Sequence, residues 1–278
     1  GFAMGYIGSI LLLILNLLLY QKYEFFGFEN AGSATRFGFI LVGIWWISFA
    51  QIAFYYLKDR STGKPLSMKI LGNGKKELMK VFKVIRTKEV MYRYLSAFFF
   101  YSMGVQTVML LAPLFADKEI GMGADEMIYI VLILQVVAVV GAYFFAWLSK
   151  IRGNGFAISV TLIIWIIICI SGYFLQEKIT FYTLASALGF VMGGVQSLSR
   201  STYSKLIPQE ATDTASYFSF YDITEKIAIV IGSLSYGFID QVTGSMRNSM
   251  VFMSVFFIVG FILLQIARIK RNLISSEV

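Results

Sequence analysis

The ionisable residues with the clearest potential for chemistry form one cluster inside an apolar stretch. Asp222, Glu225 and Lys226 directly follow the aromatic run 217–221. Asp222 and Lys226 are four residues apart, a spacing that allows an ion pair on a helix, and Arg200 can reach Asp222 across a short connection. Charges at this depth are usually paired and often functional. We predict that these four residues form a gate or coupling site, and that Glu225, the less obviously paired carboxylate, is the protonatable group. The alternative is a solvated cluster at the level of the lipid headgroups.

Two glutamines lie in a repeated sequence pattern. Residues 104–107 read Gly-Val-Gln-Thr and residues 194–197 read Gly-Val-Gln-Ser. A glutamine in hydrocarbon is costly unless its amide finds hydrogen-bond partners, so both side chains are expected to face a water-filled cavity. The alternative is that each amide bonds only to a neighbouring helix. The predicted residues of a substrate cavity are Gln106, Gln196, Thr107, Ser197 and Tyr101.

The composition shows which elements must position these residues. Of the 278 residues, 58% are hydrophobic and 14% are charged, whereas soluble domains carry about 25% charged residues. A bilayer span needs about 20 apolar residues closed into a helix. We predict an all-α membrane protein with eight transmembrane helices. The expected spans are 2–20, 34–57, 91–116, 125–149, 156–175, 180–200, 217–239 and 248–267.

The residue types limit other chemistries. The sequence has no histidine, which excludes imidazole metal sites and a histidine proton relay within these residues. The single cysteine, Cys169, lies in an apolar run and is expected to pack as a small hydrophobic side chain. We expect neither a metal nor a cofactor.

The basic residues predict the orientation of the chain in the membrane. Most of the 24 lysines and arginines fall on one side of the predicted spans, and the positive-inside rule places that side in the cytoplasm. We therefore expect a multi-pass protein of the inner (plasma) membrane with both chain ends cytoplasmic. The net charge of +8 follows this asymmetry, so nucleic acid is not an expected partner.

The longest connection, 58–90, is strongly basic. Within it Leu78, Val81, Phe82 and Ile85 recur at i, i+3, i+4 and i+7, which is the pattern of an amphipathic helix. Such a helix either lies on the inner leaflet or packs on the cytoplasmic face of the protein itself. The linker divides the chain into three predicted segments. These are residues 1–57 with two spans, the linker 58–90, and residues 91–278 with six spans, the layout of one half of a twelve-helix carrier.

Several segments resemble a known family. The residues that carry the resemblance are 189–201 (GFVMGGVQSLSRS), 206–208 (LIP), 218–222 (FSFYD) with Lys226 four residues on, and, less specifically, 1–8 and 101–107. Together they resemble the vacuole-effluxer-like branch of the major facilitator superfamily, bacterial relatives of an autophagy-associated vacuolar amino-acid exporter. The resemblance implies that the eight spans are helices five to twelve of that fold, without the first four.

The resemblance also implies a function. We expect a secondary active transporter that moves a small solute, with amino acids as the implied class, by alternating access. The expected partners are membrane lipid, a small-molecule substrate and a proton as candidate coupling ion, and the expected state is a monomer. The alternatives are a membrane-embedded enzyme and a non-transporting receptor or scaffold. An enzyme is not expected, because the spans offer no histidine and no clear nucleophile and base pair.

Overall fold

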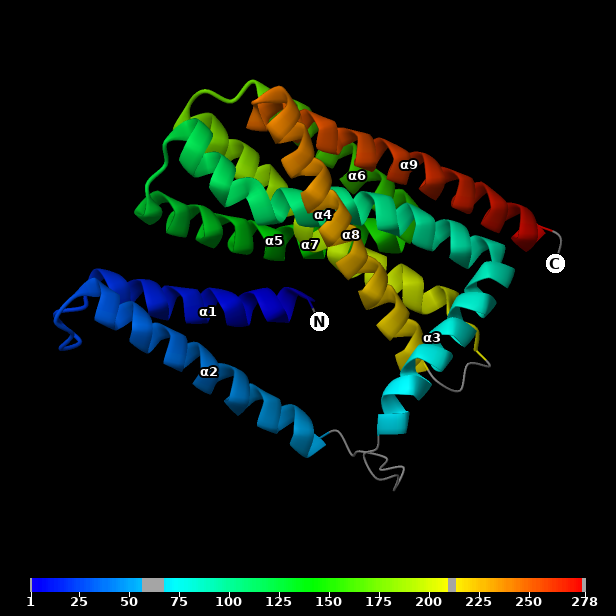
Figure 1. Ribbon diagram of the computed structural model, residues 1–278, viewed down its shortest axis with the longest axis horizontal. Helices are drawn as coiled ribbons and strands as arrows, with labels where there is room; N and C mark the ends of the chain where they lie inside the picture. Colours follow the sequence, from blue (N-terminus) through cyan, green and yellow to red (C-terminus); the bar gives the residue numbers. More distant parts are fainter. Residues whose placement is uncertain (1, 57–67, 210–213, 277–278) are drawn as a thin grey trace.

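The computed structural model describes residues 2–56, 68–209 and 214–276, and these described residues fold into nine helices with no strand (Figure 1). The helices are α1 (Phe2–Gln21), α2 (Ala31–Tyr56), α3 (Met68–Thr87), α4 (Glu89–Ile120), α5 (Ala124–Arg152), α6 (Asn154–Tyr173), α7 (Lys178–Leu206), α8 (Thr214–Thr243) and α9 (Met246–Ser276). The all-helical fold of a membrane protein is therefore confirmed.

Seven of the described helices are long and apolar enough to cross a membrane, namely α1, α2, α4, α5, α6, α7 and α9. The remaining predicted span, 217–239, lies within α8, which has 30 residues but is too polar to join this set. Its first half carries Asp222, Glu225 and Lys226. Nevertheless α8 packs against α4 and α9 and runs across the whole bundle in Figure 1. The predicted span that falls outside this set is thus the one that carries three of the four residues of the predicted coupling site.

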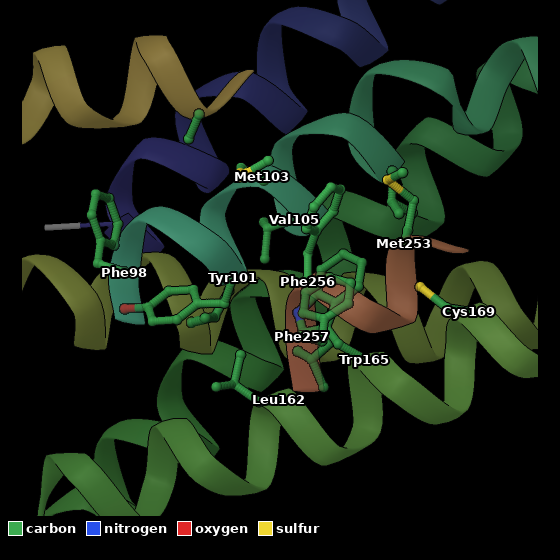
Figure 2. Packing of buried hydrophobic residues seen from close by; sticks show 14 of the residues in the cluster. Phe98, Tyr101, Met103, Val105, Leu162, Trp165, Cys169, Met253, Phe256 and Phe257 are labelled. Carbon is green, nitrogen blue, oxygen red and sulfur yellow. The ribbon is translucent and has the colours of Figure 1, made fainter. Parts of the chain in front are cut away.

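Helices α4 to α9 form the main bundle, in which α4 packs on α8 and α9 while α7 packs on α5 and α6. Aromatic side chains fill its centre. Trp165 of α6 stacks on Phe257 of α9 with ring centroids 5.2 Å apart, and Figure 2 shows this pair next to Val105 and Tyr101 of α4. Cys169 is fully buried in the same core, which agrees with its expected packing role.

Small residues allow α5 and α7 to approach closely. A methyl group placed on Gly189 would lie 2.6 Å from the carbonyl oxygen of Leu134, and one placed on Gly193 would collide with the carbonyl oxygen of Ala138. Small residues at four-residue spacing permit such backbone contact between membrane helices. This contact fixes the position of the end of α7 that carries Gln196 and Arg200.

The apolar face of α3 packs on the protein, as one of the two alternatives for the amphipathic segment expects. Val81 and Ile85 are buried, and the Phe82 ring stacks on Phe220 of α8 at a centroid distance of 5.9 Å. The beginning of the predicted linker, 58–67, lies outside the described residues. The division of the chain into three segments stays a prediction.

The first two helices are attached more loosely than the rest. Helix α1 packs on α5 and α7, and α2 packs on α1. Figure 1 shows α2 diverging from the main bundle along its length. Only 6% of the α2 span is buried, compared with 50% of the α4 span. The α1–α2 pair therefore leaves large apolar surfaces open to lipid or to other helices.

Candidate functional site

A polar cavity of about 280 Å³ lies between α4, α7 and α8. Arg200 and Glu225 are the charged residues among those that line it, and they have opposite signs. The lining residues are Phe98, Tyr101, Ser102, Val105, Gln106, Val195, Gln196, Ser199, Arg200, Tyr221 and Glu225. The cavity thus brings together five of the nine residues predicted for the substrate and coupling sites, namely Tyr101, Gln106, Gln196, Arg200 and Glu225.

The two glutamine motifs present their side chains in the same way. In each motif the glycine faces away from the cavity and packs against a ring: Gly104 against Phe257 and Gly194 against Phe145. A methyl group on either glycine would lie within 2.6 Å of ring carbon atoms. The valine and the glutamine that follow each glycine both line the cavity.

Both glutamine amides have partners from other helices. Gln106 donates a hydrogen bond through Nε2 to Oε1 of Glu225 on α8, at 2.7 Å. The Tyr6 hydroxyl on α1 donates to Oε1 of Gln196, at 3.1 Å. The two amides are therefore satisfied as polar groups at membrane depth must be, and each also lines the cavity. Each glutamine thus contacts a neighbouring helix and also lies in the lining of the cavity.

A network of hydroxyl groups closes one wall of the cavity. The hydroxyls of Tyr101 and Ser199 are 2.7 Å apart, and the Tyr94 hydroxyl donates to the backbone oxygen of Ser199 at 2.8 Å. All three side chains are buried. The network ties the first half of α4 to α7 and fixes the direction of the Tyr101 ring.

Arg200 occupies the rim of the cavity. Its Nη1 lies 3.2 Å from Oδ1 of Asp222, and both side chains are nearly half exposed. The guanidinium carbon lies 5.0 Å from the ring centroid of Phe218 and 5.9 Å from that of Tyr221, distances typical of cation–π contacts. An exposed pair of this kind contributes little stability, so Arg200 can exchange Asp222 for another anion at low cost.

Four of the predicted site residues lie outside the cavity lining. Thr107 is fully buried, with its hydroxyl against Gly232 of α8, and Ser197 donates to backbone oxygens of its own helix. Asp222 reaches the site only through Arg200. Lys226 is exposed and forms no ion pair within the described residues of the chain, so the predicted pairing with Asp222 is wrong.

The cavity also contains residues that the sequence reasoning did not select. Ser102 and Phe98 precede Gln106 by four and eight residues, and Ser199 follows Gln196 by three. This spacing places them on the same helix face as the glutamines. Following that face through neighbouring turns would have identified them. Phe98 and Tyr221 form a stacked pair with centroids 4.1 Å apart, which makes a flat aromatic wall.

A comparison with known proteins finds a matching family and several similar proteins whose names agree with it. The family described as "Vacuole effluxer Atg22 like" matches residues 1–275. The MFS-type transporter YxiO of Bacillus subtilis is 27% identical over 95% of this chain and 61% of its own length. Autophagy-related protein 22-1 of Aspergillus niger is 28% identical over 99% of this chain and 48% of its own length. Autophagy-related protein 22 of Yarrowia lipolytica is 25% identical over the whole chain and 51% of its own length.

The long apolar helices and the polar cavity between α4, α7 and α8 define a multi-pass α-helical membrane protein. The family match covers nearly all of the chain and therefore identifies the family. The chain belongs to the Atg22-like vacuole effluxer family. It spans about half to three-fifths of the length of the relatives described above.

Proposed function

We propose that this chain belongs to a secondary active transporter that moves a small solute, with amino acids as the class, by alternating access. The observation that carries the proposal is the cavity with Arg200 and Glu225 in one lining. A guanidinium is suited to binding a carboxylate through paired hydrogen bonds, and a carboxylate accepts hydrogen bonds from an ammonium group. An amino acid carries both groups, so its two ends match the two charges of the cavity.

The neutral residues of the cavity support the same solute class. Gln106 and Gln196 each offer a donor and an acceptor, and the Phe98–Tyr221 pair offers an apolar wall. Polar groups that fix the orientation of a ligand beside an apolar wall are a feature of small-molecule sites. A volume of about 280 Å³ suits a small solute. Names among the relatives, an MFS-type transporter and a vacuole effluxer family, favour transport over an enzyme, and we propose no enzymatic activity.

Alternating access requires contacts between the two halves of a carrier to break and re-form. The hydrogen bond from Tyr6 to Gln196 joins the predicted segment 1–57 to the predicted segment 91–278. We propose that this bond is one of those contacts. Glu225 is the proposed proton carrier, because its bond to Gln106 places a carboxylate directly at the solute cavity. We further propose a monomer in the plasma membrane with both chain ends in the cytoplasm.

The test is solute exchange in proteoliposomes that contain the full-length protein. A panel of radiolabelled amino acids is measured for counterflow and for uptake with and without a pH gradient. We expect counterflow of at least one member, and gradient-driven accumulation of the same member. Folded protein that binds an amino acid but exchanges none would instead favour a receptor or scaffold.

A further inference from the structure

An apolar groove lies where α3, α4 and α8 meet, apart from the polar cavity. Its volume is about 200 Å³, and its walls include Phe82 of α3, Phe99 and Phe100 of α4, and Phe220 of α8. All four rings are partly exposed, so the groove is open to the surroundings. In Figure 1, α3 lies beside the first turns of α8 at one end of the bundle, which is where this groove forms.

Positive charge borders the groove on α3. The guanidinium carbon of Arg86 lies 5.8 Å from the ring centroid of Phe82, so the charge stands beside a wall residue. The side chains of Arg86 and Lys83 are exposed. The ion pairs in this region are Lys80 with Glu77 and Arg93 with Glu89, and neither includes Arg86 or Lys83 among the described residues. The apolar groove thus lies beside a cation, Arg86, that no carboxylate of the described residues neutralises.

We propose that this groove binds one anionic phospholipid, with an acyl chain along the aromatic wall and the phosphate at Arg86. The apolar groove alone would accept the acyl chain of any lipid, whereas the adjoining cation favours a negatively charged headgroup. Basic side chains next to membrane spans attract anionic lipids in this way. Tyr92 at the groove is 47% exposed, and amphipathic aromatic residues are typical of the membrane–water interface.

The position of the groove suggests a consequence for the fold. Phe82 and Phe220 belong to both the groove and the contact between α3 and α8. A lipid chain lying against these rings would cover the open side of that contact. Bound lipid is therefore expected to hold α3 on the bundle. This role is separate from solute transport, because the groove and the polar cavity share no lining residue among those described.

The experiment is native mass spectrometry of the full-length protein titrated with phosphatidylglycerol or phosphatidylcholine. Arg86→Gln removes the cation at the groove, and Lys80→Gln is the matched control that removes one positive charge elsewhere on α3. Ser96→Phe fills the groove from α4. The Ser96 hydroxyl donates to the Tyr92 backbone oxygen in its own helix, so this change leaves the contacts between helices in place. Ser96→Leu provides a smaller filling residue if the phenylalanine variant does not fold.

We expect the unmodified protein to retain phosphatidylglycerol in preference to phosphatidylcholine. Arg86→Gln should lower phosphatidylglycerol affinity by roughly fivefold, the effect of one cation near a lipid surface, while Lys80→Gln should change it by less than about twofold. Both substitutions of Ser96 fill the groove and should reduce the binding of both lipids. Equal phosphatidylglycerol affinity in Arg86→Gln and unmodified protein would overturn the proposal, as would undiminished binding in both folded Ser96 variants. Glycerol 3-phosphate that binds as well as the lipid would show a soluble-phosphate site instead.

Discussion

Two cavities of nearly equal volume lie along the same pair of helices, and their linings differ completely. The polar cavity of about 280 Å³ contains Arg200 and Glu225. The second cavity, of about 290 Å³, is bounded by α1, α4, α5, α6, α7 and α9, and its polar side chains are confined to the uncharged Tyr6, Ser9 and Gln135 among the described residues. Size alone therefore does not mark the functional site. The functional site is marked instead by the positions of the polar residues along α4 and α7.

The boundary between the two cavities is narrow. On α4 it falls between Gln106 and Met109, and on α7 it falls between Val195 and Met192. On each helix the lining therefore changes from polar to apolar within about one helical turn. Tyr6 belongs to both sides, since it lines the apolar cavity and bonds to Gln196. A charged solute is expected to stop at this boundary while the arrangement persists, because the apolar lining offers it no charged partner among the described residues.

The largest effect is expected for Glu225, the residue of the polar cavity that we propose carries the coupling proton. Glu225→Gln keeps the size of the side chain and an oxygen that can accept from Gln106, but it cannot exchange a proton at physiological pH. Gradient-driven accumulation should be abolished, whereas counterflow should continue at saturating solute, with a raised KM because the carboxylate that accepts from the ammonium group is lost. Both are measured in proteoliposomes. Accumulation at the level of the unmodified protein would exclude Glu225 as the proton carrier.

The next effect concerns solute affinity. Arg200→Gln should raise KM for an amino acid by roughly 10- to 150-fold, which corresponds to the loss of a charge-assisted hydrogen bond of about 1.5–3 kcal/mol. Stability should change little, because the Arg200–Asp222 pair is nearly half exposed. Lys150→Gln is the control, as Lys150 is exposed on α5 and lies outside the cavity. Equal KM values for the Arg200 and Lys150 variants would contradict a carboxylate site at Arg200.

A third variant tests the apolar side of the comparison. Leu188 is buried and lines the apolar cavity. Leu188→Asn buries an amide without a partner and should lower the free energy of unfolding by about 1–3 kcal/mol. Leu188→Met keeps an apolar side chain of similar size and should cost less than about 1.5 kcal/mol. Denaturant titration in detergent micelles measures both. Equal stabilities for the two variants would mean that this cavity tolerates polar groups.

Much of the fold was predictable from the sequence because hydrocarbon imposes strong rules on each segment. The spans follow from apolar length, and the buried face of α3 follows from the spacing of Val81, Phe82 and Ile85. The cavity glutamines were predictable because an amide at membrane depth needs a partner. The close approach of α7 to a neighbouring helix was predictable from the four-residue spacing of Gly189 and Gly193.

The errors in the site have a geometric cause. Thr107 and Ser197 directly follow the glutamines in sequence, but each lies about 200° around the helix from the valine that also lines the cavity, so both fall outside the lining. Asp222 had two candidate partners, and the choice of Arg200 over Lys226 depends on how α7 and α8 pack. Nothing in the local sequence distinguishes Arg200 from Lys226 as the partner of Asp222. The contact of Tyr6 with Gln196, 190 residues apart, likewise required the tertiary structure.

The smallest expected effect tests Tyr6, which lines the apolar cavity and bonds to a residue of the polar cavity. Tyr6→Phe removes only the hydroxyl that donates to Gln196, a loss of about 0.5–1.5 kcal/mol. If this bond holds α1 against the end of the polar cavity, its loss should shift the conformational equilibrium by roughly 2- to 12-fold toward the state in which the boundary is open. The shift is small because the Tyr6 ring still fills its place in the apolar cavity.

Labelling of a cysteine in the polar cavity measures this shift. Val105→Cys, in a Cys169→Ser background, places the thiol in the cavity lining, and an impermeant thiol reagent is applied from the outer side of the membrane. Tyr6→Phe should raise the labelling rate by the same roughly 2- to 12-fold. Tyr20→Phe is the control, because Tyr20 on the same helix lies outside both cavities. Identical labelling rates in the two variants would show that α1 does not restrain the boundary, and the separation of the polar and apolar cavities would then rest on α4 and α7 alone.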